Sequence, residues 1–325
     1  MLIHDPVYGS FDITEPVLLE LIHPKPLQRL KGISQYGLPP QMYHHQGFSR
    51  YDHCVGVMLL LQKLGASLQE QIAGLLHDVS HTAFSHVVDW VVGSQEQDDF
   101  QDSIYETIIL QSEISHILQR HGFNVEDIID IKRYSLLEQP SPNLCADRVD
   151  YALREFLDYA NPEIVPQCVQ SLHAYEGKIV FTSEEIARQF ALGFLKCQTE
   201  HWGSAETVVR YHLLAKALKI GLDEKILLHD DLFQDDAFVL AKLQRSGHTQ
   251  IAQLLTMLRG KIEYEVTEKN PDISTQKKFR YVDPECMENG MISLLSNVDA
   301  IYASLIKEHQ EINQQGISIK LSATI

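Results

Sequence analysis

A histidine–aspartate pair, His77-Asp78, carries the strongest chemical signal in the chain. The dipeptide alone has little weight, because it also occurs at His4-Asp5 and His229-Asp230. Only the middle pair has suitable neighbours: His53 lies upstream, and His81 follows four residues after His77, on the same face if a helix continues. Imidazoles and carboxylates are ligands that divalent transition ions accept. This spacing therefore predicts a metal site.

A second group of acids and bases lies far downstream, in Cys145-Ala146-Asp147-Arg148-Val149-Asp150-Tyr151. On a helix these charged residues share one stripe, which can face His53 and the His77-Asp78 pair. Two imidazoles and two carboxylates would leave a divalent ion open positions for water and substrate. The alternative is a buried polar cluster that holds no metal.

The elements that must position these residues are expected to be helices. Cys54–Gly65 is apolar nearly all round, which predicts a buried helix. Ser67 and Glu70 form the sequence pattern of a capping box for the next helix, which ends at His77-Asp78. Further helices are expected at 104–121, 144–159, 183–195, 205–220 and 236–246.

The character of the sequence changes after about residue 258. Short β-prone runs occur at 262–266, 278–282 and 317–322, around one helical stretch near 292–310. We therefore expect a mostly α fold, with a helical domain over residues 1–257 and a small α+β region over residues 258–325.

Composition excludes several classes of protein. The chain has 325 residues and a formal charge of −17, which argues against bulk nucleic-acid binding, since that depends on Lys and Arg. No apolar run approaches the roughly 20 residues of a membrane span. The five cysteines are scattered and the N-terminus shows no signal-peptide pattern, so a cytoplasmic location is expected. A small phosphorylated substrate stays compatible with this charge, because a metal ion and a few bases can reverse the field locally.

Several segments in a fixed order resemble the HD-domain metal-dependent phosphohydrolase superfamily. The most similar branch contains the deoxynucleoside triphosphate triphosphohydrolases and their uncharacterised bacterial relatives. The resemblance covers residues 3–160 and, more diffusely, Arg280-Tyr281. Its segments are Asp5-Pro6-Val7-Tyr8-Gly9, Gln28-Arg29-Leu30 with Gln35-Tyr36-Gly37, Ser49-Arg50-Tyr51-Asp52-His53, the run HDVSHTAFSH over residues 77–86, and Asp147-Arg148-Val149-Asp150-Tyr151.

This resemblance implies an HD-domain helical bundle with one divalent metal ion, which could be Mn, Fe, Co, Ni, Zn or Mg. It implies an enzyme that cleaves a phosphoester of a nucleotide, or of a similar small molecule, by metal-activated water. Relatives often assemble, so a homo-oligomer is also implied. The implied metal ligands are His53, His77, Asp78 and Asp147.

The resemblance also implies roles around the metal. Asp78 would orient the water, while His81 and His86 would line the phosphate side. Arg50 and Arg148 would hold phosphates, an arrangement that suits the planar Arg fork. Gln35 would contact the sugar or base, and Tyr151 would pack against the sugar. Each has a structural alternative: a helix cap for His81, core packing for His86, Gln35 and Tyr151, and a surface ion pair for Arg148 with Asp150 or Glu155.

Two departures from the family pattern bear on the substrate. Triphosphohydrolases of this branch carry a His-Glu pair after the H-D motif, but residues 99–106 contain no histidine. Either His81, Asp102 or Glu106 would then be the general acid, or the metal alone would stabilise the leaving group. The helix around Lys196 also lacks the branch's cluster of Arg and His. We therefore expect a smaller phosphate load than a triphosphate. The alternatives are a deoxynucleoside triphosphate triphosphohydrolase and a nucleotide-sensing protein with little turnover.

Overall fold

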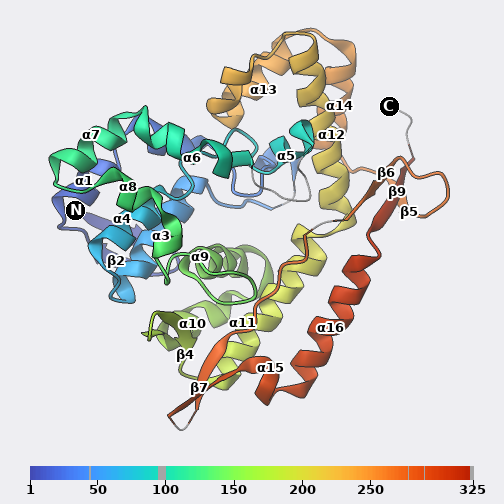
Figure 1. Ribbon diagram of the computed structural model, residues 1–325. Coiled ribbons are helices and arrows are strands. Elements are labelled where there is room, and N and C mark those ends of the chain that lie inside the picture. Colours follow the sequence, from blue (N-terminus) through green and yellow to red (C-terminus); the bar gives the residue numbers. More distant parts are fainter. Residues whose placement is uncertain (44, 94–99, 277, 289, 323–325) are drawn as a thin grey trace.

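The computed structural model describes residues 1–325 except 44, 94–99, 277, 289 and 323–325. Helices dominate it, which confirms the mostly α expectation (Figure 1). The first part of the chain begins with a hairpin of β1 (Leu2–Asp5) and β2 (Gly9–Asp12). The helices that follow are α1 (Pro16–Leu21), α2 (Lys25–Gln28), α3 (Arg50–Lys63), α4 (Leu68–Leu76), α5 (Val87–Val92), α6 (Phe100–Leu110), α7 (Glu113–Arg120), α8 (Val125–Ile129), α9 (Ala146–Glu155) and α10 (Val165–Ser171).

The second part contains long helices and most of the strands. Two short π-helical turns, η4 (Phe156–Ala160) and η6 (Gln198–Trp202), follow α9 and α11. Short 3-10 turns are η1 (Arg29–Gly32), η2 (Pro40–Met42), η3 (Ile131–Arg133), η5 (Pro162–Ile164) and η7 (His229–Phe233). The other elements are β3 (Leu172–Tyr175), β4 (Lys178–Phe181), α11 (Glu184–Cys197), α12 (Ala205–Asp223), α13 (Asp236–Arg245), α14 (Thr249–Arg259), β5 (Tyr264–Val266), β6 (Ile273–Thr275), β7 (Glu285–Glu288), β8 (Met291–Leu294), α15 (Leu295–Val298), α16 (Ala300–Gln314) and β9 (Ile317–Leu321).

Helices α3 and α4 form the centre of the first core, and α9 packs against α3. Nearly every residue of α3 is buried, as its apolar sequence predicts. Ser49 starts α3 through a complete capping box with Asp52. At α4 only half of the predicted box forms: Ser67 accepts the Glu70 N–H, while the Glu70 carboxylate accepts N–H groups from the loop at 136–137.

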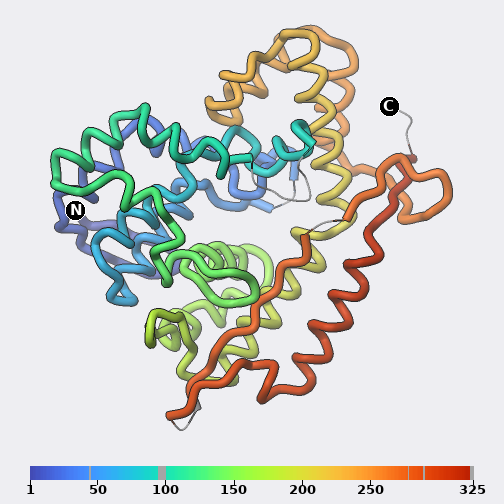
Figure 2. Tube along the Cα trace, viewed as in Figure 1, coloured from blue at the N-terminus to red at the C-terminus, as the bar shows by residue number. Residues whose placement is uncertain are grey.

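A second core lies among α12, α13 and α14, which group together at the top of Figure 1. We call these three helices the upper lobe. The tube in Figure 2 shows how α11 and α12 run end to end and join the upper lobe to the rest of the molecule. Residues Ala83, Phe84, Val87 and Val88 pack into this second core, although the chain just before them belongs to the first.

The C-terminal region combines strands with a long helix, as predicted, but it does not stand apart. Strand β9 lies between β5 and β6, whereas β7 and β8 extend the β3–β4 hairpin into a four-stranded sheet. Strand β7 pairs in parallel with β4, where Val180 lies opposite Glu285. The division near residue 257 stays a prediction, and it falls close to the end of α14.

Two sequence-based expectations about individual elements were wrong. The helix expected over 104–121 is divided between α6 and α7, where Ser112 caps a new helix. The strand expected over 278–282 is an extended segment without strand partners. Its carbonyls are taken by side chains: Tyr302 donates to Val282 O, and Ser141 donates to Tyr281 O. None of the described helices is long and apolar enough to cross a membrane.

Candidate metal centre

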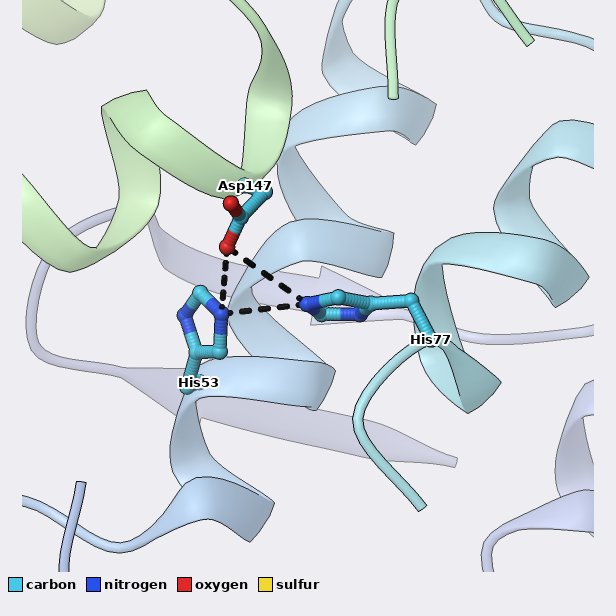
Figure 3. Close-up of side chains that lie close together, drawn as sticks. All are labelled: His53, His77 and Asp147. Atoms are coloured by element: carbon cyan, nitrogen blue, oxygen red, sulfur yellow. Dashed lines mark hydrogen bonds and ion pairs between the residues drawn. The ribbon is translucent and has the colours of Figure 1, made fainter. Parts of the chain in front are cut away.

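Three side chains from separate helices converge on one point (Figure 3). His53 lies in the first turn of α3, His77 caps the end of α4, and Asp147 is the second residue of α9. The His53 Nε2 atom lies 2.9 Å from Asp147 Oδ1 and 3.2 Å from His77 Nε2. His77 Nε2 lies 3.5 Å from the same Asp147 oxygen. We call these three residues the trio.

The Nδ1 atom of each imidazole, on the side away from the trio, already has a hydrogen-bond partner. His53 Nδ1 lies 2.8 Å from Asp150 Oδ2, and His77 Nδ1 lies 2.7 Å from the carbonyl of Gly74. Both partners only accept, so each Nδ1 carries the proton and each Nε2 keeps its lone pair when the ring is neutral. Two lone pairs and a carboxylate oxygen then face one another across about 3 Å. Only a cation relieves this repulsion, so the trio suits a divalent ion.

A buried ion-pair chain holds His53 in place. Asp150 Oδ2 also accepts from Arg154 Nε at 2.8 Å, and Arg154 Nη2 donates to Asp5 Oδ2 at 2.6 Å. Gly56 makes room for this chain, because a Cβ there would lie 2.0 Å from Arg154 Nη2 and 2.1 Å from Asp150 Oδ1. Asp150 and Arg154 were not expected at the centre from the sequence. Their spacing from Asp147, three and seven residues along α9, was the available signal.

Asp78 lies beside the trio rather than inside it. Its Oδ1 is 3.6 Å from His77 Nε2, while its Oδ2 is 3.8 Å from His53 Nε2 and forms an ion pair with Arg50. Arg50, expected to hold a phosphate, is only 2% exposed and also donates from Nε to Ser85 Oγ at 2.7 Å. Arg50 thus orients Asp78, although its Nη2 has no hydrogen-bond partner and the side chain borders the cavity described below.

The charges of the centre stabilise one another. Burial lowers the pKa of His77, but the charges of Asp78 and Asp147 outweigh this effect and raise its pKa to about 9. Burial raises the pKa of Asp147, yet hydrogen bonds from His53 and His77 hold that pKa well below its usual value. The pKa of Asp78 is also held low, against burial, mainly by Arg50 and His77. The centre therefore retains protons at neutral pH unless another cation replaces them.

Two further histidines, His81 and His86, lie beyond Asp78. Helix α4 does not continue to His81; a turn brings His81 Nε2 to 3.3 Å from Asp78 Oδ1. Burial and the charge of Arg50 lower the pKa of His81 to about 3, so this ring is neutral. The His86 ring lies edge-on to His81 at 5.1 Å, and its Nδ1 is 3.1 Å from Oδ2 of the buried Asp89.

The centre opens into a cavity of about 2000 Å³, part of which is open solvent. We call it the metal cavity. His77, Asp78, His81, His86 and Asp147 line it, together with Asp102 on the exposed side of α6. Its cationic lining comes from four separate segments and consists of Arg50, Lys132, Arg148, Lys278 and Arg280. Lys132 and Lys278 carried no recognisable signal in the sequence, because neither belongs to a motif.

Arg148 makes different contacts from those expected. Its Nη1 donates to Asn143 O at 2.5 Å and its Nη2 to Gln139 O at 3.2 Å, so it holds the loop before α9. Its nearest acid is Glu138, at 3.7 Å. The surface pair with Asp150 or Glu155 does not form: Asp150 faces His53 and Arg154, and Glu155 accepts from Tyr36 and Trp202.

An aromatic chamber of about 730 Å³, part of it open, adjoins the metal cavity. Gln35 and Tyr151 line both spaces, so two residues expected to contact the organic part of a substrate lie at their junction. Tyr151 lies edge-on to Trp202 at 5.4 Å. Lys196 lines neither space and lies over the Tyr159 ring instead. The other lining residues are Tyr36, Leu38, Tyr43, Arg50, His86, Glu155, His201, Trp202, Thr207, Tyr211 and Arg280.

The chain is similar in sequence to several known proteins. The chain is 40% identical over 287 residues to the uncharacterized protein YdhJ of Bacillus subtilis, covering 87% of this chain and 88% of that protein. It is 30% identical over 226 residues to the metal-dependent phosphohydrolase cns2 of Cordyceps militaris, covering 67% and 65%. A deoxynucleoside triphosphate triphosphohydrolase SAMHD1 homolog of Dictyostelium discoideum is 22% identical over 315 residues, with coverage of 86% and 57%.

A solved structure of a hypothetical protein from Aquifex aeolicus has the same fold, with a TM-score of 0.72 at 19% identity over 94% of this chain and 93% of that one. The model of the HD domain matches residues 50–163, a range that begins at Arg50 and contains the whole trio. Family model, relatives and buried His/Asp centre agree. The chain belongs to the HD-domain family and is a metal-dependent phosphohydrolase.

Proposed function

We propose that this enzyme hydrolyses a phosphoester of a nucleotide, or of a similar small phosphorylated molecule. One observation carries the proposal: two members of the trio, His77 and Asp147, line a cavity that five basic side chains also line, next to an aromatic chamber. The phosphoryl group would lie in the metal cavity, and the organic group would extend into the chamber past Gln35 and Tyr151.

The residues of the centre divide the work. His53, His77 and Asp147, with Asp78 beside them, would hold a divalent ion, which would supply an activated water and polarise a phosphoryl oxygen. Asp78, fixed by Arg50, accepts hydrogen bonds and orients the attacking water. Neutral His81 cannot neutralise phosphate charge, so it donates a hydrogen bond at most.

His86 is the best-placed proton donor for the leaving oxygen. Its Nδ1 proton is held by Asp89, which fixes the ring and leaves Nε2 to carry a second proton when the imidazole is charged. It lines both the metal cavity and the aromatic chamber, so it borders the place where the two halves of a substrate separate. This arrangement supplies an acid in place of the family's His-Glu pair. Asp102, on the exposed side of α6, remains the alternative.

A second candidate is the triphosphate triphosphohydrolase, which the cationic lining favours. The expectation of a small phosphate load depended on the helix around Lys196. Lys132, Lys278 and Arg280 come from other segments and supply cations to the metal cavity. Close to four negative charges on a triphosphate could be met by these residues and Arg148. The relationship to the Dictyostelium protein supports the same candidate.

Hydrolysis of a panel of mono-, tri- and cyclic nucleotides by Mn²⁺-loaded protein tests the proposal. Release of phosphate supports the phosphomonoester reading, and release of tripolyphosphate supports the second candidate. Asp147→Asn removes a trio oxygen, and Asp230→Asn, in the third His-Asp pair, is its matched control. Turnover that survives Asp147→Asn would contradict the site, whereas binding without turnover would indicate a nucleotide sensor.

We also infer a cytoplasmic location. All five cysteines lie among the described residues, where each is buried and none forms a disulfide. Free buried thiols are typical of a reducing compartment. Labelling of the intact cell and its fractions with an antibody to the chain would test this inference.

A further inference from the structure

Asp236, the first residue of α13, holds a carboxylate in a buried position where it forms no ion pair with any lysine or arginine in the described part of the chain. It is 5% exposed. Its Oδ1 accepts the Phe84 N–H at 2.7 Å, and its Oδ2 accepts the Ser34 N–H at 2.9 Å. Both partners belong to segments next to the metal centre, whereas α13 belongs to the upper lobe, apart from α3, α4 and α9 (Figure 1).

The segment that Asp236 holds is a strained turn. Phe84 and Ser85 have φ angles of 62° and 46°, in the left-handed region that residues other than glycine rarely adopt. Residues in this conformation are strained and persist only where the surroundings hold them. The upper lobe and the η7 turn that precedes α13 do so at two points: Asp236 accepts from Phe84 N, and Leu232 O in η7 accepts from Ala83 N at 2.8 Å.

The strained turn in turn holds Arg50. Ser85 Oγ accepts from Arg50 Nε at 2.7 Å and donates to Ser34 O at 2.8 Å. The Ser34 N–H returns to Asp236, which closes a ring of hydrogen bonds. Arg50 extends this ring to Asp78, its ion-pair partner at the metal centre.

We propose that Asp236 is a positioning residue for the metal centre, acting through the Phe84–Ser85 turn and Arg50 to hold the Asp78 carboxylate. The upper lobe thereby sets the geometry of a site whose metal ligands all lie in the other core. The activity readout of this inference rests on the proposed function, but its metal-binding readout does not.

The protonation state of Asp236 is part of this positioning. Burial raises the pKa of Asp236 to about 7, against the two N–H groups that favour the ionised form. The charged groups that face it are Asp235 on its own helix, which raises the pKa, and Arg50, which lowers it. When the carboxyl group is protonated, one of the two N–H groups faces a hydroxyl group instead of a carboxylate oxygen and loses its strong acceptor. Below about pH 7 the ring of hydrogen bonds is therefore weaker.

The test compares Mn²⁺ dissociation constants of the whole protein and of Asp236→Asn by titration calorimetry from pH 5.5 to 8.5. Asparagine can accept only one of the two N–H groups and mimics the protonated acid. Partners that orient metal ligands change affinity by about 10–100-fold. We expect the dissociation constant of Asp236→Asn to exceed that of the unmutated protein by a factor of that size at pH 8.5, and the two constants to approach each other at pH 5.5. Protonation of the metal ligands affects both proteins alike, so it cancels in the ratio of the two constants.

Three variants make the result decisive. Asp235→Asn is the matched control, because asparagine also caps α13 well; it should bind Mn²⁺ like the unmutated protein. Ser85→Ala cuts the same ring at another point and should give a similar loss. Asp236→Asn combined with Ser85→Ala should lose little more than either alone. An unchanged affinity in Asp236→Asn, or a ratio independent of pH, would overturn the inference, whatever happens to the melting temperature or to turnover.

Discussion

Gly56→Ala tests whether the buried Asp150–Arg154 pair controls the metal centre. The glycine lies in the middle of α3, where alanine is favoured by about 1 kcal/mol as a helix former. The added Cβ would lie 2.0 Å from Arg154 Nη2 and 2.1 Å from Asp150 Oδ1, whereas ordinary contact begins near 3.4 Å. Both groups must therefore retreat by more than an ångström. Because Asp150 fixes His53, the imidazole loses its hydrogen bond or follows the movement.

The expected magnitudes separate stability from metal binding. Overpacking typically costs about 1–3 kcal/mol, and the gain in helix propensity offsets part of it, so the melting temperature should fall by only a few degrees. A lost hydrogen bond to a charged group is worth about 1.5–3 kcal/mol, or one to two powers of ten in Mn²⁺ affinity. Calorimetric Mn²⁺ titration and thermal denaturation measure the two effects.

Gly221→Ala is the matched control. It places a Cβ 2.7 Å from a Leu243 methyl group, in the last turn of α12 and within the second core. This variant should change the melting temperature by a similar amount and leave Mn²⁺ affinity unchanged. If Gly56→Ala bound Mn²⁺ as tightly as the unmutated protein, the role of Asp150 in orienting His53 would be refuted.

Three further outcomes are expected. Asp78→Ala should reduce the Mn²⁺ content and abolish hydrolysis, while Asp230→Ala should preserve both, as measured by metal analysis and a phosphatase assay. The reverse pattern would refute the assignment of His77-Asp78 to the metal centre. Arg148→Ala should lower kcat/KM by about 10–100-fold with little change in bound Mn²⁺. Arg148→Lys should restore kcat/KM only in part, because lysine lacks the planar fork that binds two phosphate oxygens. Full activity of Arg148→Ala would show that Arg148 only holds the loop before α9. The pKa of His77 is raised to about 9 in the folded protein. The protonated ring therefore stabilises the metal-free protein fully below about pH 6.5, and this stabilisation is lost as the pH rises through 9. Denaturant titrations should show this pH dependence of the unfolding free energy in the unmutated protein and not in His77→Gln.

The sequence predicted those parts of the molecule that local patterns encode. The apolar run in α3 and the Ser67 cap of α4 are local signals, and both act as expected in the structure, although the Glu70 half of the capping box does not form. The resemblance of the ordered His53, His77 and Asp147 segments to the HD-domain family predicted that these residues meet. Their neighbours Asp150 and Arg154 were missed, because an acid and a base four apart on a helix also describe an ordinary surface pair.

Other parts depend on contacts between distant segments. Nothing near Asp236 shows that its carboxylate accepts two N–H groups from residues 152 and 202 positions away. The segment after residue 277 is β-prone, yet it remains unpaired because side chains of residues 141 and 302 occupy its carbonyls. Lys278 and Arg280 reach the metal cavity only because this segment crosses it. Such placements follow from the tertiary fold and carry no local periodicity.

The net charge of −17 and the charges of the metal cavity have a joint consequence for substrate choice. Five basic and five acidic side chains line the cavity, so a divalent ion bound there would make it positive within an acidic chain, and only a molecule small enough to lie inside would meet that positive charge. The five basic side chains come from α3, η3, α9 and the segment that carries Lys278 and Arg280, so they do not form a stripe along one helix. A stripe follows the backbone of an extended nucleic acid, whereas basic groups gathered in one cavity suit a compact phosphate group. The arrangement of these charges therefore supports the proposal of a small phosphorylated substrate.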